Sequence, residues 1–213
     1  MRDFAMAMGH ITTVMTHVSA VILCGGRSTR MGEDKGALPF GDETMLTRIV
    51  RIVRSISDAV IVVGRRNQDL PADVTVIHDP IEDLGPLSGI AAGLAASTSD
   101  LNILVACDMP LIKPEVLRRL LSMIDDHDAC VAVADGHASA LCGIYRSRIA
   151  PEAQSLLDAG ERRVMRLLDR VLTKRVDAAA FRDIDPDLET FISVDTPGKY
   201  ADAVVRLKPD TTG

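Results

Sequence analysis

Short apolar runs rich in Val, Ile and Ala alternate along the chain with segments whose apolar residues recur at helical spacing. Residues 18–24 are apolar at nearly every position, which predicts a strand buried on both faces. In residues 45–55, Leu46, Ile49 and Val50 fall on one side of a helix. The same patterns predict further strands at 59–63, 74–78, 101–107, 129–134, 138–145 and near 191–194, and further helices at 87–97, 114–124, 149–157, 164–168 and from about 197.

Buried strands that do not alternate, separated by helices, are typical of a parallel sheet covered on both faces. We therefore predict an α/β fold: a Rossmann-like, doubly wound, mainly parallel sheet with helices on both faces. Residues 15–207 are expected to form a single domain, because no linker or repeat divides them. Residues 1–14 are interpreted as a disordered extension. The alternative is that translation starts at Met15 and not at Met1. Residues 208–213 are interpreted as a flexible tail.

Composition narrows the kinds of function. The chain of 213 residues is 47% hydrophobic, and its net charge of −6 argues against a general binder of nucleic acids or membrane surfaces. No apolar run approaches the roughly 18–20 residues of a membrane span. The cysteines lie in apolar, strand-like runs and form no C-x-x-C pair, which indicates reduced thiols in a cytoplasmic protein. Any basic site must therefore be local.

Charged residues follow several of the predicted strands. A glycine-rich basic segment, GGRSTRMGEDK, comes after the first strand, and Asp79, Asp108 and Asp195 come near the ends of later ones. In doubly wound sheets, ligands bind beyond the carboxyl ends of the strands. We therefore expect the basic segment and the three acids to meet at one edge of the sheet.

The basic segment predicts a phosphate-binding loop. Gly25 and Gly26 allow backbone N–H groups to approach phosphate oxygens closely, while Arg30 supplies a planar fork and Lys35 a compact charge. The spacing is that of neither a P-loop nor a dinucleotide fingerprint. The alternative is a flexible surface turn with solvated charges.

Asp108 is the predicted metal ligand, because Mg²⁺ is usually held by one or two carboxylates together with substrate phosphates. It lies too far upstream to cap the next predicted helix. Asp79 is a candidate nucleotide contact or a turn-forming Asp-Pro residue. Asp195 is a candidate second metal carboxylate, but either it or Thr196 could instead cap the helix that begins near Pro197.

Three further features have two interpretations each. The segment GPLSGI, residues 85–90, leads into a helix start that faces a base or ribose, or it is an ordinary loop-to-helix junction. His137 is either a contact to a second substrate or a structural residue. Arg162 and Arg163, in GERRVMRLLD, either cradle an anionic second substrate or lie on a solvated helical face.

LCGGRSTRMGEDK resembles the L-x-G-G-x-x-x-R-M-G-x-D-K signature of the molybdenum cofactor guanylyltransferases. GPLSGI, CDMP and GERRVM follow in the order of that family, so the resemblance covers about residues 18–205. It implies a nucleotide-diphospho-sugar transferase-like fold and transfer of GMP from Mg-GTP to the terminal phosphate of molybdopterin or Mo-molybdopterin, releasing pyrophosphate. It also implies transient contacts with cofactor-synthesis proteins or apo-molybdoenzymes.

The resemblance also assigns roles by position. The nucleotide contacts that it implies are Leu23, Cys24, Gly25, Gly26, Lys35, Asp79 and Asp108. The mechanism that we expect is in-line attack on the α-phosphorus of GTP, with Arg30 and Lys35 stabilising the departing pyrophosphate and Mg²⁺ on Asp108 offsetting charge. A phosphate nucleophile is already ionised at neutral pH, so no general base is needed.

The chain departs from the family pattern at three places. Cys24 replaces a usual Ala, Val63-Gly64-Arg65 stands where relatives have an Asn, and the late motif Asn-x-Asn-Thr-Pro is here Ser193-Val194-Asp195-Thr196-Pro197. Gly25-Gly26, where related cytidylyltransferases carry Ala-Gly, favours guanine. The alternatives are a cytidylyltransferase for the same cofactor, another transferase acting on a sugar phosphate or cobinamide phosphate, and a non-catalytic module that delivers the cofactor.

Overall fold

A seven-stranded sheet runs through the part of the chain that the computed structural model describes, residues 17–25, 34–65, 70–78 and 85–207. The strand order is β5-β4-β1-β6-β8-β7-β9. The strands are β1 (Val18–Cys24), β4 (Ala59–Gly64), β5 (Thr75–His78), β6 (Leu101–Ala106), β7 (Ala129–Ala134), β8 (His137–Arg146) and β9 (Thr173–Asp177). Two short strands, β2 (Pro39–Phe40) and β3 (Glu43–Thr44), form a separate antiparallel pair.

Strand β1 lies in the middle of the sheet and is parallel to both of its neighbours, β4 and β6. Only β8 among the seven runs antiparallel to the strands beside it. It follows β7 through a two-residue turn, Asp135-Gly136, in which both residues have positive φ, 50° and 75°. This is the turn geometry that joins antiparallel strands tightly. The prediction of a mainly parallel sheet is confirmed.

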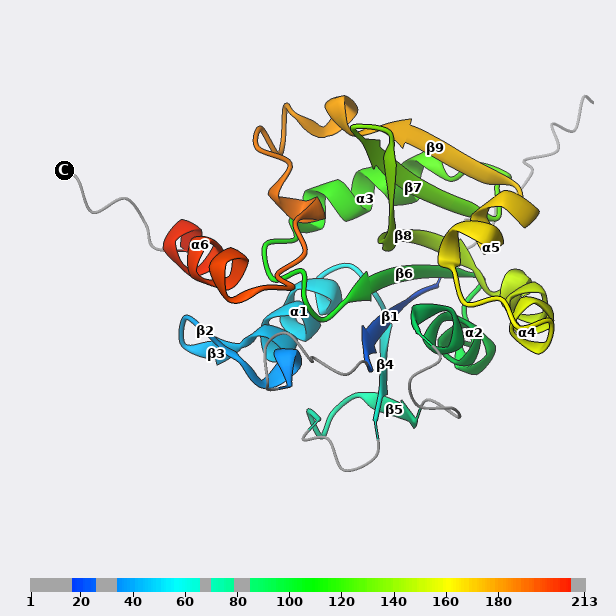
Figure 1. Cartoon of the computed structure of the whole chain (residues 1–213), viewed down its shortest axis with the longest axis horizontal. Coiled ribbons are helices and arrows are strands. Elements are labelled where there is room, and N and C mark those ends of the chain that lie inside the picture. The colour runs from blue at the N-terminus through cyan, green and yellow to red at the C-terminus, as the bar shows by residue number, and fades with distance from the viewer. Residues whose placement is uncertain (1–16, 26–33, 66–69, 79–84, 208–213) are drawn as a thin grey trace, which may run out of the picture.

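Helices cover both faces of the sheet. They are α1 (Met45–Arg54), α2 (Pro86–Ala96), α3 (Pro114–Met123), α4 (Ala150–Asp158), α5 (Val164–Arg170) and α6 (Pro197–Leu207), with single turns of 3₁₀-helix at η1 (Lys35–Ala37), η2 (Ser147–Ile149), η3 (Ala178–Phe181) and η4 (Glu189–Phe191). Figure 1 shows α2, α4 and α5 on one side of the sheet and α1 and α3 on the other. The doubly wound α/β class is therefore confirmed.

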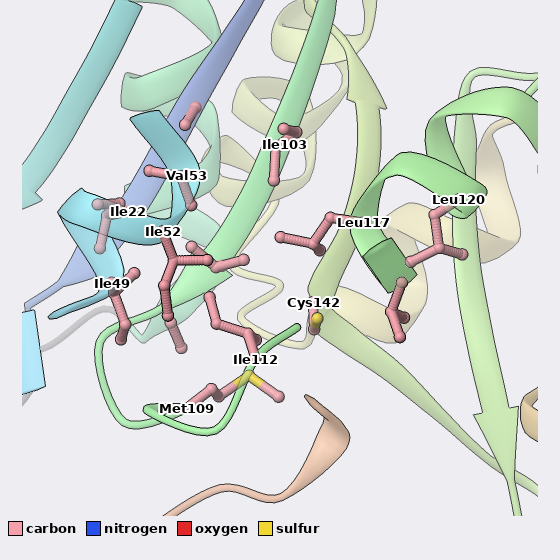
Figure 2. Close-up of a cluster of buried hydrophobic side chains, with 14 of the residues drawn as sticks. Ile22, Ile49, Ile52, Val53, Ile103, Met109, Ile112, Leu117, Leu120 and Cys142 are labelled. Carbon is pink, nitrogen blue, oxygen red and sulfur yellow. The ribbon is translucent and has the colours of Figure 1, made fainter. Parts of the chain in front are cut away.

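The core is divided by the sheet into two layers, because successive side chains of β1 point to opposite faces. Ile22 packs with residues of α1 and α3, in the layer that Figure 2 shows, while Val21 and Leu23 pack with residues of α2, α4 and α5. A third, smaller cluster lies beneath α6 and includes Phe40 and Val194. The end of β1 is thus held from both faces.

Helix α2 packs unusually close to the sheet. A Cβ added at Gly93 would lie 2.4 Å from Val21 Cγ1 and 3.0 Å from Val63 Cγ2, so only glycine fits there without a shift. A Cβ at Gly89 would lie 3.1 Å from Leu23 Cδ2. The small residues of this helix bring its first turn to the carboxyl end of β1.

One predicted strand is wrong, and the short strands β2 and β3 and the edge strand β9 were not predicted. Residues 191–194 form no strand: Phe191 ends η4, and the N–H of Val194 donates to Asp108 O at 2.7 Å instead of joining the sheet. Strand β9 pairs with β7 at the edge of the sheet, where the polar sequence TKRVD gave no apolar signal. None of the described helices has the length and apolar character to cross a membrane. The predictions for residues 1–14 and 208–213 lie outside the described residues.

Candidate active site

A pocket of about 190 Å³ opens between the carboxyl ends of β1 and β6. From β1 the chain passes to β4 on one side and later to β6 on the other, so this is a topological switch point, where doubly wound sheets bind ligands. The lining residues are Leu23, Cys24, Gly25, Asp34, Lys35, Pro86, Ala106, Cys107, Asp108 and Leu141. Five predicted nucleotide contacts, Leu23, Cys24, Gly25, Lys35 and Asp108, are brought together here.

Lys35 is positioned by a short helix that rests on the end of β1. Asp34 caps the start of η1, and its side chain accepts a hydrogen bond from Gly36 N at 3.0 Å. A Cβ at Gly36 would lie 2.7 Å from Cys24 Sγ, so η1 packs directly on the last residue of the strand. This contact fixes the backbone from which the Lys35 side chain reaches the pocket.

Asp108 follows β6 in a loop that is anchored on both sides. Cys107 N donates to Leu23 O at 2.9 Å, which ties the start of the loop to β1. The next residue, Met109, is 4% exposed and, with Ile112, lies in the apolar layer shown in Figure 2. Arg48 Nε donates to Pro110 O at 2.7 Å. The Asp108 carboxylate therefore stands at the pocket on a well-held backbone.

The Asp108 carboxylate receives two donors on the same oxygen. Lys35 Nζ lies 2.9 Å from Asp108 Oδ2, in an ion pair whose side chains are only 20% and 18% exposed. Ser193 Oγ donates to the same Oδ2 at 3.0 Å. Neither contact uses Oδ1. Ser193 was not among the predicted site residues, although it opens the late motif that the sequence singled out.

The donor set fits a hard cation shared with substrate phosphates. Among the described residues, no three His, Cys, Asp or Glu side chains gather as a metal site. Mg²⁺ does not need such a cage, since it usually takes one or two carboxylates and completes its shell with phosphates and water. Asp108 already faces a cationic group, Lys35 Nζ, at the pocket. Asp108 would therefore hold the metal with the nucleotide supplying further oxygens.

Asp195 lies against Lys199, and its neighbour caps the helix. Asp195 Oδ1 is 2.7 Å from Lys199 Nζ, and this contact with the ammonium group, with a smaller effect of the Lys35 charge, lowers the pKa of Asp195. Thr196 Oγ1 accepts from Lys199 N at 3.3 Å, so Thr196 is the residue that caps α6. The role of Asp195 as a second metal carboxylate stays a prediction.

His137 stands on a hairpin that extends past the end of β6. Val105, near the end of β6, pairs with Cys142 of β8, so the residues before Leu141 run beyond β6. His137 begins β8 at the tip, is exposed, and has its Nδ1 2.8 Å from Asp135 O. Leu141, further along β8, lines the pocket, whereas His137 is not among the lining residues, so its contact with a second substrate stays a prediction.

Arg162 and Arg163 precede α5 in a loop beside the start of α2. A Cβ at Gly85 would lie 3.8 Å from Arg162 O, which puts this loop near the pocket edge formed by Pro86. The Arg163 guanidinium donates to Glu161, and two backbone N–H groups add to it, so the pKa of Glu161 falls to about 2. Both arginines are exposed, and the charge of Arg163 is offset by Glu161.

Cys107 was also not predicted as a pocket residue. A hydrogen bond with Cys24, followed by burial, raises the pKa of the Cys107 thiol, which keeps it protonated. All four cysteines are free thiols. Three predicted site residues, Gly26, Arg30 and Asp79, lie outside the described residues, so their roles stay predictions.

Solved structures place this architecture in a class. The fold is similar to that of molybdopterin-guanine dinucleotide biosynthesis protein A from Archaeoglobus fulgidus, with 22% identity, a TM-score of 0.78, and coverage of 88% of this chain and 97% of that one. It is also similar to 4-diphosphocytidyl-2C-methyl-D-erythritol synthase from Anaerococcus prevotii, with 13% identity, a TM-score of 0.67, and coverage of 91% and 97%. The class is the nucleotide-diphospho-sugar transferase-like α/β fold.

Sequence relatives narrow the class. Residues 20–175 match the MobA-like NTP transferase domain. A probable molybdenum cofactor guanylyltransferase of Pelotomaculum thermopropionicum is 30% identical, covering 93% of this chain and 98% of the relative. One of the same name from Methanosarcina mazei is 31% identical, covering 84% and 86%. The chain belongs to the family of MobA-like NTP transferase domains and is a nucleotidyltransferase, which confirms the resemblance seen in the motifs.

Proposed function

We propose that this nucleotidyltransferase transfers GMP from Mg-GTP to the terminal phosphate of molybdopterin or Mo-molybdopterin, forming the guanine dinucleotide cofactor and pyrophosphate. The observation that carries the proposal is the Lys35–Asp108 pair at the switch-point pocket, in a chain whose relatives bear the guanylyltransferase name. The Gly25-Gly26 sequence, where related cytidylyltransferases have Ala-Gly, favours guanine.

The reaction is an in-line displacement. An ionised oxygen of the pterin phosphate forms a bond to the α-phosphorus of GTP, and the bond from that phosphorus to the β-phosphate oxygen breaks, so pyrophosphate leaves with the electron pair. Asp108 holds Mg²⁺, which when bound supplies positive charge at the reacting phosphates. Lys35, together with Arg30, stabilises the charge on the departing pyrophosphate. The chain's contribution is positioning and electrostatics.

The remaining residues divide between the two substrates. We propose that Leu23, Cys24, Gly25, Gly26 and Asp79 contact the nucleotide. His137, Arg162 and Arg163 would meet the anionic second substrate. This is supported by the loop before α5, which lies beside Gly85 and Pro86, and by the strand that His137 begins, whose Leu141 lines the pocket. A cytoplasmic site of action is supported by the four free thiols. Transient contacts with cofactor-synthesis proteins or apo-molybdoenzymes stay a prediction.

The proposal is tested by pyrophosphate release from the purified protein with molybdopterin and either GTP or CTP. We expect release with GTP, and a loss of at least about 100-fold in kcat for Asp108→Asn, the size typical when one group that stabilises transition-state charge is removed. Asp202→Asn is the matched control, because it makes the same change from carboxylate to carboxamide at an exposed position on α6. Preference for CTP would favour the cytidylyltransferase alternative. Cofactor binding without release from either nucleotide would favour a delivery module.

A further inference from the structure

The Asp108 carboxylate has a second partner that the proposed reaction does not use. Ser193 Oγ donates to Asp108 Oδ2 at 3.0 Å across a sequence separation of 85 residues. We infer that Ser193 is a positioning residue, which holds the Asp108 carboxylate so that Oδ1 is presented to the divalent metal. This inference rests on the proposed function, because it concerns the metal that the nucleotide brings.

Ser193 is held in place by its neighbour. Val194 N donates to Asp108 O at 2.7 Å, and the Val194 side chain is fully buried beside Phe40 and Leu111 in the cluster beneath α6. The backbone on either side of the Ser193–Asp108 contact is therefore fixed independently of the hydroxyl. The hydroxyl adds a restraint on the rotation of the carboxylate itself.

Lys35 cannot serve as that restraint during the reaction. Its ammonium group is needed at the phosphates, and while it pairs with Asp108 it offsets the charge that a metal would use. The Ser193 hydroxyl is neutral, so it orients Oδ2 and leaves the carboxylate its full negative charge. Partners of this kind orient metal ligands, and their removal typically weakens metal affinity or activity about 10–100-fold.

The test compares Ser193→Ala with Ser193→Thr, which keeps the hydroxyl, and with Ser122→Ala as a matched control. Ser122 also donates one hydrogen bond, to Arg119 O at 2.8 Å, but on an exposed helix face of α3. Binding of Mn²⁺, a spectroscopic stand-in for Mg²⁺, is measured by electron paramagnetic resonance in the presence of a non-hydrolysable GTP analogue. Affinity for the analogue without metal is measured alongside.

We expect Ser193→Ala to weaken Mn²⁺ binding about 10-fold, with metal-free affinity for the analogue unchanged. Ser193→Thr and Ser122→Ala should stay within about 2-fold of the unmodified protein, because both keep the donor to Asp108. In turnover assays, the loss in Ser193→Ala should shrink as the metal concentration rises. A purely structural role for Ser193 would instead lower the melting temperature without this metal dependence.

Unchanged Mn²⁺ affinity in folded Ser193→Ala, or an equal loss in Ser193→Thr, would overturn the inference. If Ser193→Ala does not fold, Ser193→Cys replaces it, since a thiol keeps the size but donates weakly. An unmodified protein that binds the analogue but no Mn²⁺ would refute the proposed metal chemistry, and with it the role of Ser193. Normal Mn²⁺ binding by the unmodified protein, unaltered in the variants, refutes the role of Ser193 alone.

Discussion

At the scale of single residues, the site depends on one ion pair between groups that have different tasks. Lys35 and Asp108 are 2.9 Å apart and mostly shielded from solvent, so each offsets the charge of the other. A triphosphate offers Lys35 an alternative partner, and a divalent metal offers one to Asp108. We therefore expect the nucleotide and the metal to bind with positive cooperativity. The nucleotide draws Lys35 away from Asp108, and the metal draws Asp108 away from Lys35.

Lys35→Met tests the lysine within this exchange. Methionine keeps an apolar stem but removes the charge, so we expect kcat/KM for GTP to fall about 100-fold through lost stabilisation of phosphate charge. The melting temperature should change little, because Asp108 retains its hydrogen bond from Ser193. Steady-state kinetics check this. Lys174→Met, which removes a half-buried lysine paired with the exposed Asp125, is the control. An unchanged kcat/KM would remove Lys35 from the mechanism.

Sequence reasoning at this scale indicated residues that come after buried strands, although their roles stay predictions. Lys35 and Asp108 were assigned from their places after β1 and β6, and the structure brings them together. Ser193 was not found, because its role depends on a contact over 85 residues and on a segment expected to be a strand. Residue type alone carries no signal for such a contact.

At the scale of elements, the packing of α2 on the sheet determines how close the start of this helix lies to the end of β1. This helix packs on β1 and β4 and against α4, so it is apolar on nearly all sides. Its glycines allow the approach, and Pro86 at its start lines the pocket. Close packing along the helix therefore sets the position of one pocket wall.

Gly93→Val tests this packing. The added side chain would meet Val21 and Val63, where even a Cβ comes within 2.4 Å of Val21 Cγ1. Overpacking of this kind typically costs about 1–3 kcal/mol, which corresponds to roughly 2–12 °C in melting temperature for a chain of this size. Differential scanning calorimetry measures it. Gly198→Ala, where nothing lies within 4 Å of the added Cβ, should be nearly neutral. Equal effects of the two changes would contradict the packing argument.

Most strands were predictable because their apolar runs are continuous, and most helices because their apolar residues recur at helical spacing. The structure ends β1 at Cys24 and begins α1 at Met45, as the pattern indicated. Strand β9 was missed because an edge strand with exposed side chains needs no apolar run. Residues 191–194 have an apolar pattern, but they bury Val194 beneath α6 without any strand partner. Apolar pattern reports burial more reliably than it reports the element.

At the scale of the whole molecule, a buried carboxylate, Asp185, fastens the irregular segment before α6 to the start of α3. Asp185 is fully buried and lies 2.7 Å from Lys113 at the start of α3. Burial by itself would raise the pKa of Asp185, but hydrogen bonds from Lys113 and Thr190 outweigh it and hold the pKa below its ordinary value. This tie lies upstream of Ser193 and Val194, which reach Asp108.

Lys113→Met tests the tie through its pH dependence. Because the folded pKa of Asp185 is depressed, its ionised form stabilises the fold above the unfolded pKa of about 4, and this stability is lost as pH falls through the folded value. Removing Lys113 leaves a buried unpaired carboxylate, so we expect a loss of about 3 kcal/mol in the free energy of unfolding at pH 7.

The loss should shrink when pH falls below about 4, because protonation then relieves the unpaired charge. Urea unfolding at both pH values measures the difference. Lys174→Met should cost less than about 1 kcal/mol, since its partner Asp125 is exposed. A loss in Lys113→Met that is the same at both pH values would show that the lysine acts through packing and not through charge.

The position of the pocket could be predicted from the sequence, because a doubly wound sheet binds ligands beyond the carboxyl ends of its strands. That rule located the pocket without any knowledge of the strand order. The return of residues 178–196 to the Asp108 loop did not follow, because it is irregular and is set by single contacts such as Lys113–Asp185. Such segments have no period to detect.

The antiparallel direction of β8 has a consequence for how this molecule can change over evolution. Its hairpin with β7 ends in the turn Asp135-Gly136, beyond the end of β6, and β8 then contributes Leu141 to the pocket lining. Lys35 and Asp108, by contrast, stand on η1 and on the loop after β6. A hairpin tip can lengthen or shorten by residue pairs while the rest of the ladder keeps its register. The hairpin and the chemical centre are separate modules. The same fold can therefore keep its nucleotide chemistry while the length and sequence of the β7–β8 hairpin change to suit a different acceptor.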